Sequence, residues 1–517
     1  MRAVLLAGIG LTFGVAAGAW FALAPASNEA ARPDAVPAVT IVEEIRPLRF
    51  VPCWFAEAEA HGTRCAELAV PERWDAAGSR MLQLKLVVIG PERPDDAIVF
   101  VSGGPGSGAG IDTSGIAAWW LQAETTPWLG RREIVVFDQR GAGLSEPDLR
   151  CPEIAAAERA VFVADLTSAQ EAAAARGAAA ACHARLAAAG VDFSGYTTEA
   201  MVEDLRHLVG ALGLEDPALI ATSFGTRIVL TYLRDTHAKA RAVVLDSVYP
   251  PDVAALSELG WDAADSFAAL FRRCADKATC REAAPDSAAV FERVLDRAAT
   301  RPVPLDLIEP ATKQPVRVEF GADKLIETLA YGFYDRQALD GMPAVLAAVD
   351  RGHPEALAPL AQVAFQQYGW ADSSLGLYLS VVCHDEYPFD PPEAIAREAA
   401  ALPRFARLVE EDFPIVACPA WPVGAADPAT RRPVESDVPA LLLSGQFDIV
   451  TPPRWARQAA AHMPHATAIT LADIGHGALH NHDCAYLLAG RFLDHPDKPV
   501  YDDCLLTATP AEAKAGP

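Results

Sequence analysis

Three residues, Ser223, Asp448 and His476, stand in this order along the chain and could together transfer an acyl group. A serine hydroxyl becomes a nucleophile when a histidine accepts its proton. A carboxylate on the other side of the imidazole fixes the tautomer and stabilises the charge that develops there. The sequence therefore predicts a covalent acyl-enzyme mechanism, with Ser223 as nucleophile, His476 as general base and Asp448 as the orienting acid.

Ser223 is predicted to lie on a sharp turn between a buried strand and a helix. The apolar run ALIAT, residues 218–222, precedes it, and FGTRIVL, residues 224–230, follows it. Such an elbow needs small residues two positions before and two positions after the serine, because strand and helix pass close together. These residues are Ala221 and Gly225. The usual pattern is G-x-S-x-G, and we expect the extra methyl group of Ala221 to be tolerated.

The acid and the base each follow another short apolar run. Asp448 comes just after residues 440–445, and His476 stands between two glycines just after residues 466–471. Either residue alone could be a loop aspartate or a helix-capping histidine. Both follow a serine elbow in the order serine, acid, histidine, which favours a catalytic triad.

A glycine-rich loop upstream could stabilise the oxyanion. Residues 102–108, SGGPGSG, follow the strand-like run 97–101. An oxyanion hole needs two backbone donors, and we expect them to be the N–H groups of Phe224 and Gly104, with Gly103 as the second choice. A phosphate-binding loop is the competing interpretation, but the Gly-Lys-Ser/Thr ending that it requires is absent from this stretch.

Three of these stretches resemble the prolyl aminopeptidase and tripeptidyl aminopeptidase branch of the α/β-hydrolases. They are SGGPG at 102–106, FDQRGAGLS at 137–145 and the serine elbow. Ser102 stands where that branch usually has histidine. The tripeptidyl group is the more similar, through the cysteine-containing stretches 53–71 and 484–504. The resemblance implies an α/β-hydrolase fold, release of short peptides, typically tripeptides, from a free N-terminus, and no metal or organic cofactor.

Two charged residues of the second motif, Asp138 and Arg140, need not be catalytic. We expect them to form a structural ion pair that holds this loop beside the site.

The pattern of strand-like and helical segments supports the same fold class. Strands alternate with amphipathic helices from residue 82 to about residue 248, which predicts an α/β-hydrolase fold with a mostly parallel central sheet. Helical patterns dominate afterwards, until the run that carries the acid. The predicted domains are a signal peptide or N-terminal anchor (1–26), a linker (27–48), the first part of the core (49–252), a mainly helical lid (253–433) and the C-terminal part of the core (434–510).

The predicted lid contains two adjacent acids, Asp385 and Glu386. They could bind the protonated amine of a substrate, as lid acids do in the related aminopeptidases. The alternative is a solvated acidic pair at the surface.

The N-terminus and the cysteines both indicate export. Met1 and Arg2 precede an apolar run, residues 3–24, that is typical of a signal peptide cleaved before Ser27 or of an uncleaved anchor. The ten cysteines are even in number, which favours disulfides in an oxidising compartment, and sequential pairing is the simplest connectivity. We expect a periplasmic, secreted or membrane-anchored protein whose catalytic domain lies outside the cytoplasm.

The chain of 517 residues carries a formal net charge of −25. Nucleic acids and anionic membrane surfaces would repel such a protein, so we expect neither as a partner. The expected partner is a peptide substrate, and the oligomeric state is open. Two alternatives remain, a carboxylesterase on the same fold and a non-catalytic exported binding protein.

Overall fold

The computed structural model describes residues 48–92, 96–164, 166–234, 238, 240–367, 373–410, 413–501 and 504. The predicted export segment, residues 1–26, lies outside the described residues, as does the predicted linker up to residue 47. Within the described ranges, no helix combines the length and the apolar character needed to cross a bilayer.

Nine strands form one sheet, in the order β1-β2-β3-β5-β4-β6-β7-β10-β11. Strands β1, β2, β3 and β5 pair antiparallel, and every pairing from β5 to β11 is parallel. This confirms the predicted mostly parallel α/β sheet; β1 and β2, which precede residue 82, were missed. The strands are β1 Leu48–Val51, β2 Thr63–Pro71, β3 Met81–Ile89, β4 Ala97–Val101, β5 Glu133–Phe137, β6 Ala218–Thr222, β7 Ala242–Asp246, β10 Ala440–Gly445 and β11 Ala466–Leu471.

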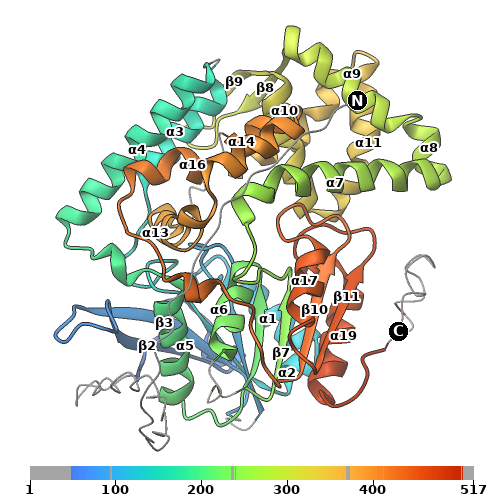
Figure 1. The fold of residues 1–517 in the computed structure, drawn as a ribbon. Helices are drawn as coiled ribbons and strands as arrows, with labels where there is room; N and C mark the ends of the chain where they lie inside the picture. Colours follow the sequence, from blue (N-terminus) through green and yellow to red (C-terminus); the bar gives the residue numbers. More distant parts are fainter. Residues whose placement is uncertain are drawn as a thin grey trace, which may run out of the picture. The chain divides into compact units, whose positions relative to one another are not determined.

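Alternate residues of the strands point to opposite faces, and each face is covered by helices (Figure 1). In β6, Leu219 packs with α5, α6 and α17, whereas Ile220 packs with α1 and α19. Parallel sheets need this cover, because both of their faces are apolar. The helices of the core are α1 Ile116–Thr125, α2 Pro127–Gly130, α5 Thr198–Ala211, α6 Phe224–Leu233, α17 Pro453–Ala460, α18 Ala478–Asn481 and α19 Asp483–Asp494.

The chain between β7 and β10 is mostly helical and has an apolar core of its own (Figure 1). We call residues 247–439 the insertion. Its two-stranded sheet, β8 Val303–Ile308 with β9 Pro315–Phe320, was not anticipated, and the predicted lid boundaries stay a prediction. The helices are α7 Ala255–Asp276, α8 Ala278–Ala283, α9 Ser287–Thr300, α10 Ala322–Tyr331, α11 Arg336–Asp350, α12 Ala358–Gln367, α13 Leu375–Asp385, α14 Pro392–Ala401, α15 Ala406–Glu410 and α16 Phe413–Ala417. Short 3₁₀ turns occur in the core and in the insertion, at η1 Glu59–His61, η3 Phe193–Gly195, η4 Gly332–Tyr334, η5 Pro354–Leu357, η6 Tyr387–Phe389, η7 Cys418–Ala420 and η8 Pro428–Arg431.

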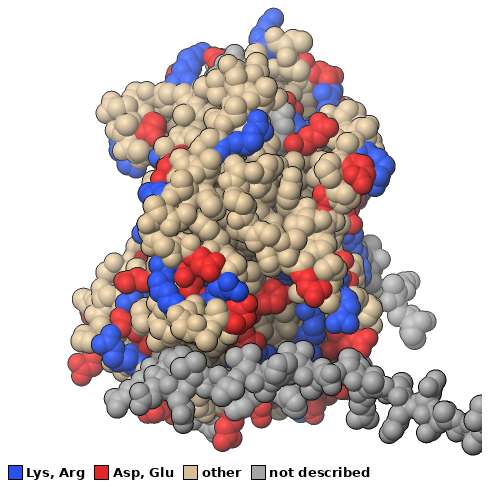
Figure 2. Space-filling model, turned by 60° about the vertical axis from the view of Figure 1, so that its left-hand side comes forward, with Lys and Arg blue, Asp and Glu red and all other residues tan. Residues whose placement is uncertain are grey.

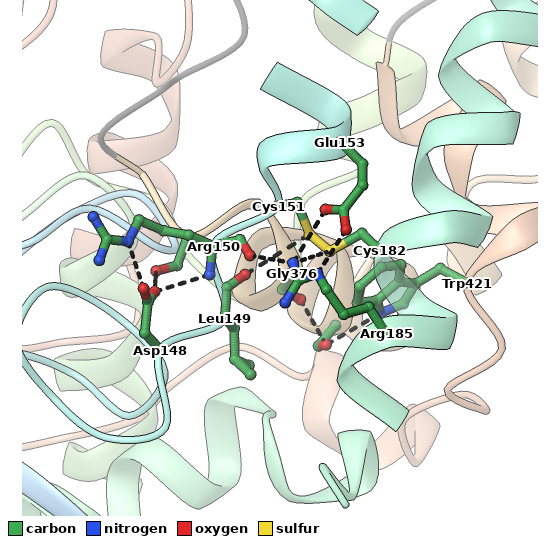
Figure 3. The surroundings of a disulfide bond; sticks show 11 residues. Asp148, Leu149, Arg150, Cys151, Glu153, Cys182, Arg185, Gly376 and Trp421 are labelled. Atoms are coloured by element: carbon green, nitrogen blue, oxygen red, sulfur yellow. Dashed lines mark hydrogen bonds and ion pairs between the residues drawn. A yellow bond between two sulfur atoms is a disulfide. The ribbon is translucent and has the colours of Figure 1, made fainter. Parts of the chain in front are cut away.

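Two helices expected in the core, α3 (Pro152–Val163) and α4 (Ser168–Ala188), pack against the insertion instead (Figure 1). Phe162 of α3 lies in the apolar core of the insertion and stacks on Phe365, with 4.7 Å between ring centroids. The disulfide Cys151–Cys182 ties α3 to α4 (Figure 3). The insertion therefore rests on a platform that comes from an earlier part of the chain.

All ten cysteines are paired in sequential order, the simplest of the connectivities that the sequence leaves open. The pairs are Cys53–Cys65, Cys151–Cys182, Cys274–Cys280, Cys383–Cys418 and Cys484–Cys504.

Acidic and basic side chains are interspersed on the face that Figure 2 presents, and the middle of this face carries few of either. On this side of the molecule, the net charge is not gathered into one acidic patch.

Candidate active site

Ser223 stands on the turn between β6 and α6, as the sequence predicts, with a positive φ of 55°. This conformation is strained for a non-glycine residue. A Cβ added at Gly225 would lie 2.3 Å from the Val101 carbonyl oxygen, so only glycine fits there. The methyl group of Ala221 is buried in the apolar core beside the sheet.

The structure brings Asp448 and His476 together. The Nδ1 atom of His476 lies 2.9 Å from Oδ2 and 3.0 Å from Oδ1 of Asp448. Asp448 is fully buried, and its neighbours Phe447 and Ile449 belong to the apolar core of the insertion. The loop after β10 is thus fixed by the insertion as well as by the sheet.

Hydrogen bonds orient the Asp448 carboxylate further. Its Oδ1 accepts the N–H groups of Val450 and Thr451 at 3.0 and 2.8 Å, and its Oδ2 accepts the Thr451 hydroxyl at 2.8 Å. Burial raises the pKa of Asp448, but His476 and these donors outweigh it, so the pKa lies below its ordinary value. Burial lowers the pKa of His476, yet the Asp448 carboxylate more than offsets this and places that pKa above its ordinary value. The pair is therefore arranged to hold a proton on the imidazole.

Ser223 and His476 line one cavity of about 640 Å³. Both predicted loop glycines, Gly103 and Gly104, also line it. A Cβ at Gly103 would lie 3.0 Å from Cβ and 3.7 Å from Oγ of Ser223, so the loop backbone passes directly beside Ser223. Phe224 begins α6, and its N–H belongs to the first helical turn, whose amides have no partner within the helix. Gly103 thus lies beside Ser223, and the roles of the Phe224 and Gly104 N–H groups as oxyanion donors stay a prediction.

Sequence reasoning missed Asp246, the last residue of β7, which is bonded to both halves of the site. Its carbonyl oxygen accepts the Ser223 N–H at 2.8 Å. Its carboxylate accepts the N–H groups of Ala478 and Leu479 at 2.8 and 3.0 Å, just after the histidine loop. A charged residue at the carboxyl end of an apolar parallel strand was the signal that could have found it.

The insertion also holds the histidine loop. The His476 N–H donates to the Phe333 carbonyl oxygen at 2.8 Å, and the Tyr334 ring contacts the imidazole edge to face, with centroids 5.0 Å apart. A Cβ at Gly475 would lie 1.9 Å from the same carbonyl oxygen, so glycine is required there. These contacts span more than 140 positions of the chain and leave no local signal in the sequence.

The two predicted amine-binding acids, Asp385 and Glu386, do not line the cavity around Ser223. Both are buried, at 3% and 2% exposure. Glu386 forms ion pairs with Arg227 of α6 and Arg431, and Asp385 accepts the N–H and hydroxyl of Thr198 at the start of α5. The amine-anchor expectation is therefore corrected: both carboxylates already have partners of the chain itself, and they join the insertion to the core.

The expected ion pair between Asp138 and Arg140 is also wrong. Arg140 pairs with the buried Asp204 of α5, with Nε donating to Oδ2 at 2.6 Å. Asp138 instead accepts the N–H groups of Ala109 and Leu144 at 2.6 and 2.7 Å. Residues so close in sequence point to different neighbours, because the chain turns sharply after β5.

Comparisons with known proteins agree with this geometry. The family model described as alpha/beta hydrolase fold matches residues 96–315, and the model described as TAP-like protein matches residues 407–504. "Serine protease Hip1" of Mycobacterium tuberculosis is 24% identical over 440 residues, which cover 79% of this chain and 81% of that protein. The protein of the same name from Mycobacterium bovis matches to the same extent.

Solved structures with detectable similarity include a proline iminopeptidase from Mycobacterium smegmatis and a thermophilic esterase from Thermogutta terrifontis. The first has a TM-score of 0.37 and 16% identity, and covers 83% of this chain and 98% of its own. The second has a TM-score of 0.35 and 15% identity, and covers 83% of this chain and 99% of its own. The sheet order, the serine elbow and the two family models lead to one conclusion: the chain has the α/β-hydrolase fold, and its C-terminal region is similar to TAP-like proteins.

Proposed function

We propose that this protein is an exported serine hydrolase that releases short peptides, tripeptides above all, from free N-termini. One observation carries the proposal: the strained Ser223 and a His476 held by a buried Asp448 line the same cavity. The similarity to a protein named as a serine protease and the TAP-like match favour a peptide bond as the target.

The mechanism follows from the roles of the three residues. His476 takes the proton of the Ser223 hydroxyl, which attacks the carbonyl carbon of the substrate. The N–H groups of Phe224 and of the 103–104 loop receive the oxyanion, and His476 returns its proton to the leaving amine. Water then attacks the acyl-enzyme in the same way, and Asp448 stabilises the imidazolium in both halves of the cycle.

The cavity volume supports a substrate of several residues. A space of about 640 Å³ lies within the range of sites that enclose most of a drug-sized ligand. Its wall includes the aromatic residues Phe100, Trp119 and Tyr249, which offer apolar contacts to peptide side chains.

The five disulfides favour export, because such bonds persist in oxidising compartments. Expression of the full chain in a bacterial host, followed by fractionation and thiol alkylation, tests this part. A protein that stays in the cytoplasm with alkylatable cysteines would contradict it.

The activity is tested with three substrates: Ala-Ala-Pro-arylamide with a free N-terminus, its N-acetylated twin, and a short p-nitrophenyl ester. We expect cleavage of the free peptide and poor cleavage of the blocked one. Cleavage of the ester with neither peptide would make the protein a carboxylesterase instead.

The control is Ser223→Ala, which removes the nucleophile and little else. It is expected to lose activity by several orders of magnitude and to lose labelling by a fluorophosphonate probe, with the fold intact. If the native chain itself failed to label and to cleave all three substrates, a non-catalytic binding protein would be the better description.

A further inference from the structure

The glycine-rich loop beside Ser223 is anchored at both ends on residues that follow β5. We call residues 102–109 the oxyanion loop, because it contains the amides proposed to bind the oxyanion. At its start, the Ser102 carbonyl oxygen accepts the side-chain amide of Gln139 at 2.7 Å. At its end, the Ala109 N–H donates to Oδ1 of Asp138 at 2.6 Å. The core therefore fixes the two ends of the loop.

The middle of the oxyanion loop is held by the insertion. The Ser374 N–H donates to the Gly106 carbonyl oxygen at 2.9 Å. The contact is close, since a Cβ at Gly106 would lie 2.5 Å from the Ser374 carbonyl oxygen. Ser374 is 1% exposed and directly precedes α13. Each residue of the oxyanion loop except Gly106 lines the active-site cavity, so the loop lies between the cavity on one side and Ser374 on the other.

A tight turn connects Gly106 to the expected oxyanion donor, Gly104. A Cβ at Gly104 would lie 2.6 Å from the Gly106 nitrogen and 2.8 Å from the Ser107 nitrogen. Both glycines have a positive φ, 114° at Gly104 and 98° at Gly106. Atoms packed so closely transmit a displacement instead of absorbing it. A shift of the Gly106 carbonyl would therefore also move the Gly104 N–H.

The start of α13 is fixed on its other side as well. The Gly376 N–H donates to the Leu149 carbonyl oxygen at 2.9 Å, and a Cβ at Gly376 would lie 2.5 Å from the same oxygen. Figure 3 shows Leu149 and Gly376 near the disulfide Cys151–Cys182. The first turn of α13 thus lies between the oxyanion loop and the segment that leads into α3.

The rest of α13 is placed by the active-site cavity and by α5. Tyr378, near the middle of the helix, lines the cavity. At the far end of the helix, Asp385 accepts the N–H and the hydroxyl of Thr198. Because α13 has partners in the core at both ends, it can hold Ser374 at a fixed distance from the site.

We infer that Ser374 is a positioning residue of the reaction: its backbone N–H holds Gly106 and thereby sets where the amides of the oxyanion loop lie relative to Ser223. This rests on the proposed function, and it gives the insertion a part in the chemical step. The oxyanion exists only in the transition state and the tetrahedral intermediate, so a misplaced donor lowers kcat more than it changes KM.

Ser374→Pro is the direct test, because proline has no N–H and its ring occupies the place from which Ser374 donates. The φ of Ser374, −82°, is close to the angle that proline requires. We expect kcat to fall by about 10- to 100-fold and KM to change by less than about threefold. Ser374→Ala keeps the N–H and loses only the hydroxyl, which donates to Asp148 at 3.3 Å, so it should restore most of kcat.

Gly376→Ala tests the same helix end without touching Ser374. Its added methyl group would meet the Leu149 carbonyl oxygen and displace the first turn of α13, so kcat should fall by about three- to tenfold. The matched control is Gly341→Ala, within α11 of the insertion, where an added Cβ has no atom within 4 Å. We expect kcat of this control to equal that of the native protein. The two alanine variants decide the question even if Ser374→Pro does not fold.

Two further measurements separate positioning from a general loosening of the site. Complete labelling by a fluorophosphonate probe counts the competent molecules, and kcat is expressed per labelled Ser223. The acid limb of kcat/KM should keep its pH in Ser374→Pro, because the contact between His476 and Asp448 is not changed. A trifluoromethyl ketone analogue of the substrate, whose adduct carries the oxyanion, should bind more weakly by the same factor as kcat/KM falls.

Each variant is assayed with the free peptide and with the p-nitrophenyl ester, since acylation and deacylation both form an oxyanion with either substrate. If the native protein cleaved only the ester, and kcat for the ester fell in Ser374→Pro and Gly376→Ala, the peptidase function would fail while the role of Ser374 stood. Equal kcat in the native protein and both variants would overturn the inference. A rise of KM at constant kcat would overturn it as well, because it would place Ser374 in substrate binding alone.

Discussion

Two buried acids of this protein, Asp448 and Glu386, have similar surroundings and different partners. Their exposures are 0% and 2%, and each lies in a loop or helix end where the core meets the insertion. Asp448 contacts His476, whose imidazole lines the active-site cavity. Glu386 contacts the guanidinium groups of Arg227 and Arg431 and does not line that cavity.

The comparison shows that the role of a buried acid depends on the group that its carboxylate contacts. An imidazole gains and loses a proton near neutral pH, so an acid that holds it can support proton transfer. A guanidinium stays charged throughout, so an acid that holds it can only join parts of the structure. The first pair is thus suited to catalysis and the second to holding the insertion on α6.

The largest effect is expected for Asp448→Asn, which tests the catalytic side of the comparison. The amide cannot stabilise the imidazolium and favours the wrong tautomer, so kcat/KM should fall by about 10⁴-fold. Steady-state kinetics with the free peptide checks this, and near-UV circular dichroism checks that the fold is kept. A loss of less than about tenfold would mean that Asp448 is a structural acid like Glu386.

The pH dependence of kcat/KM provides a second test of the role of Asp448. The neutral form of His476 is the base, so kcat/KM should rise as the pH increases through the pKa of His476. Asp448 holds this pKa above the ordinary value, so the acid limb of the native profile should lie above about pH 6.5. In Asp448→Asn the limb should move to lower pH. An acid limb at the same pH in both proteins would contradict the assignment of Asp448 as the acid that raises the pKa of His476.

Glu386→Gln tests the structural side. It leaves Arg227, which is 3% exposed, without its counter-charge, and the free energy of unfolding should fall by about 3–5 kcal/mol. Denaturant titration measures this, and the activity per folded molecule should change far less than in Asp448→Asn. Glu153→Gln, whose pair with Arg185 is more exposed, should cost less than about 1 kcal/mol.

The disulfide Cys383–Cys418 fixes the segment that carries Glu386. Replacing both cysteines by serine opens a loop of 35 residues and should destabilise the protein by about 2–4 kcal/mol. The matched control is the pair Cys274–Cys280, which spans only 6 residues and should have a smaller effect, because less chain entropy is restored. Thermal unfolding of the two double variants, compared side by side, decides the order.

A smaller effect on catalysis than that of Asp448→Asn is expected for Asp246→Asn, which changes a buried acid that contacts neither an imidazole nor a guanidinium. The amide side chain has one acceptor for the two N–H groups of Ala478 and Leu479, so the histidine loop should shift slightly. We expect kcat to fall by about tenfold, with KM nearly unchanged. Burial raises the pKa of Asp246 to about 6, so native activity should also decline as Asp246 is protonated below that pH. An unchanged kcat would show that these bonds do not position His476.

The proposed triad could be selected from the sequence because each of its members stands in a local motif. Gly225 and Gly475 stand in recognisable short motifs, although the atoms that require glycine there, the carbonyl oxygens of Val101 and Phe333, come from distant parts of the chain. The sequential disulfides were predictable as the simplest pairing. The strands from residue 82 onward were predictable from apolar runs, whereas β1 and β2 were missed.

Other features could not be predicted, because they depend on residues far apart in the chain. The partners of Asp385, Glu386 and Arg140 are side chains that no local pattern connects to them. The packing of α3 and α4 against the insertion depends on contacts such as Phe162 on Phe365. The β8–β9 pair was not predicted, because helical patterns surround it in the sequence.

The sequence by itself thus determined the fold class and indicated the proposed nucleophile, acid and base, since strand, turn and glycine preferences are local properties of the backbone. Only the tertiary structure decided which buried acids are neutralised and which remain available. That outcome depends on the distance of each carboxylate from a cation and from water, and such distances are set by packing across the whole molecule. For this reason Asp385 and Glu386, conspicuous in the sequence, are buried against partners from distant parts of the chain.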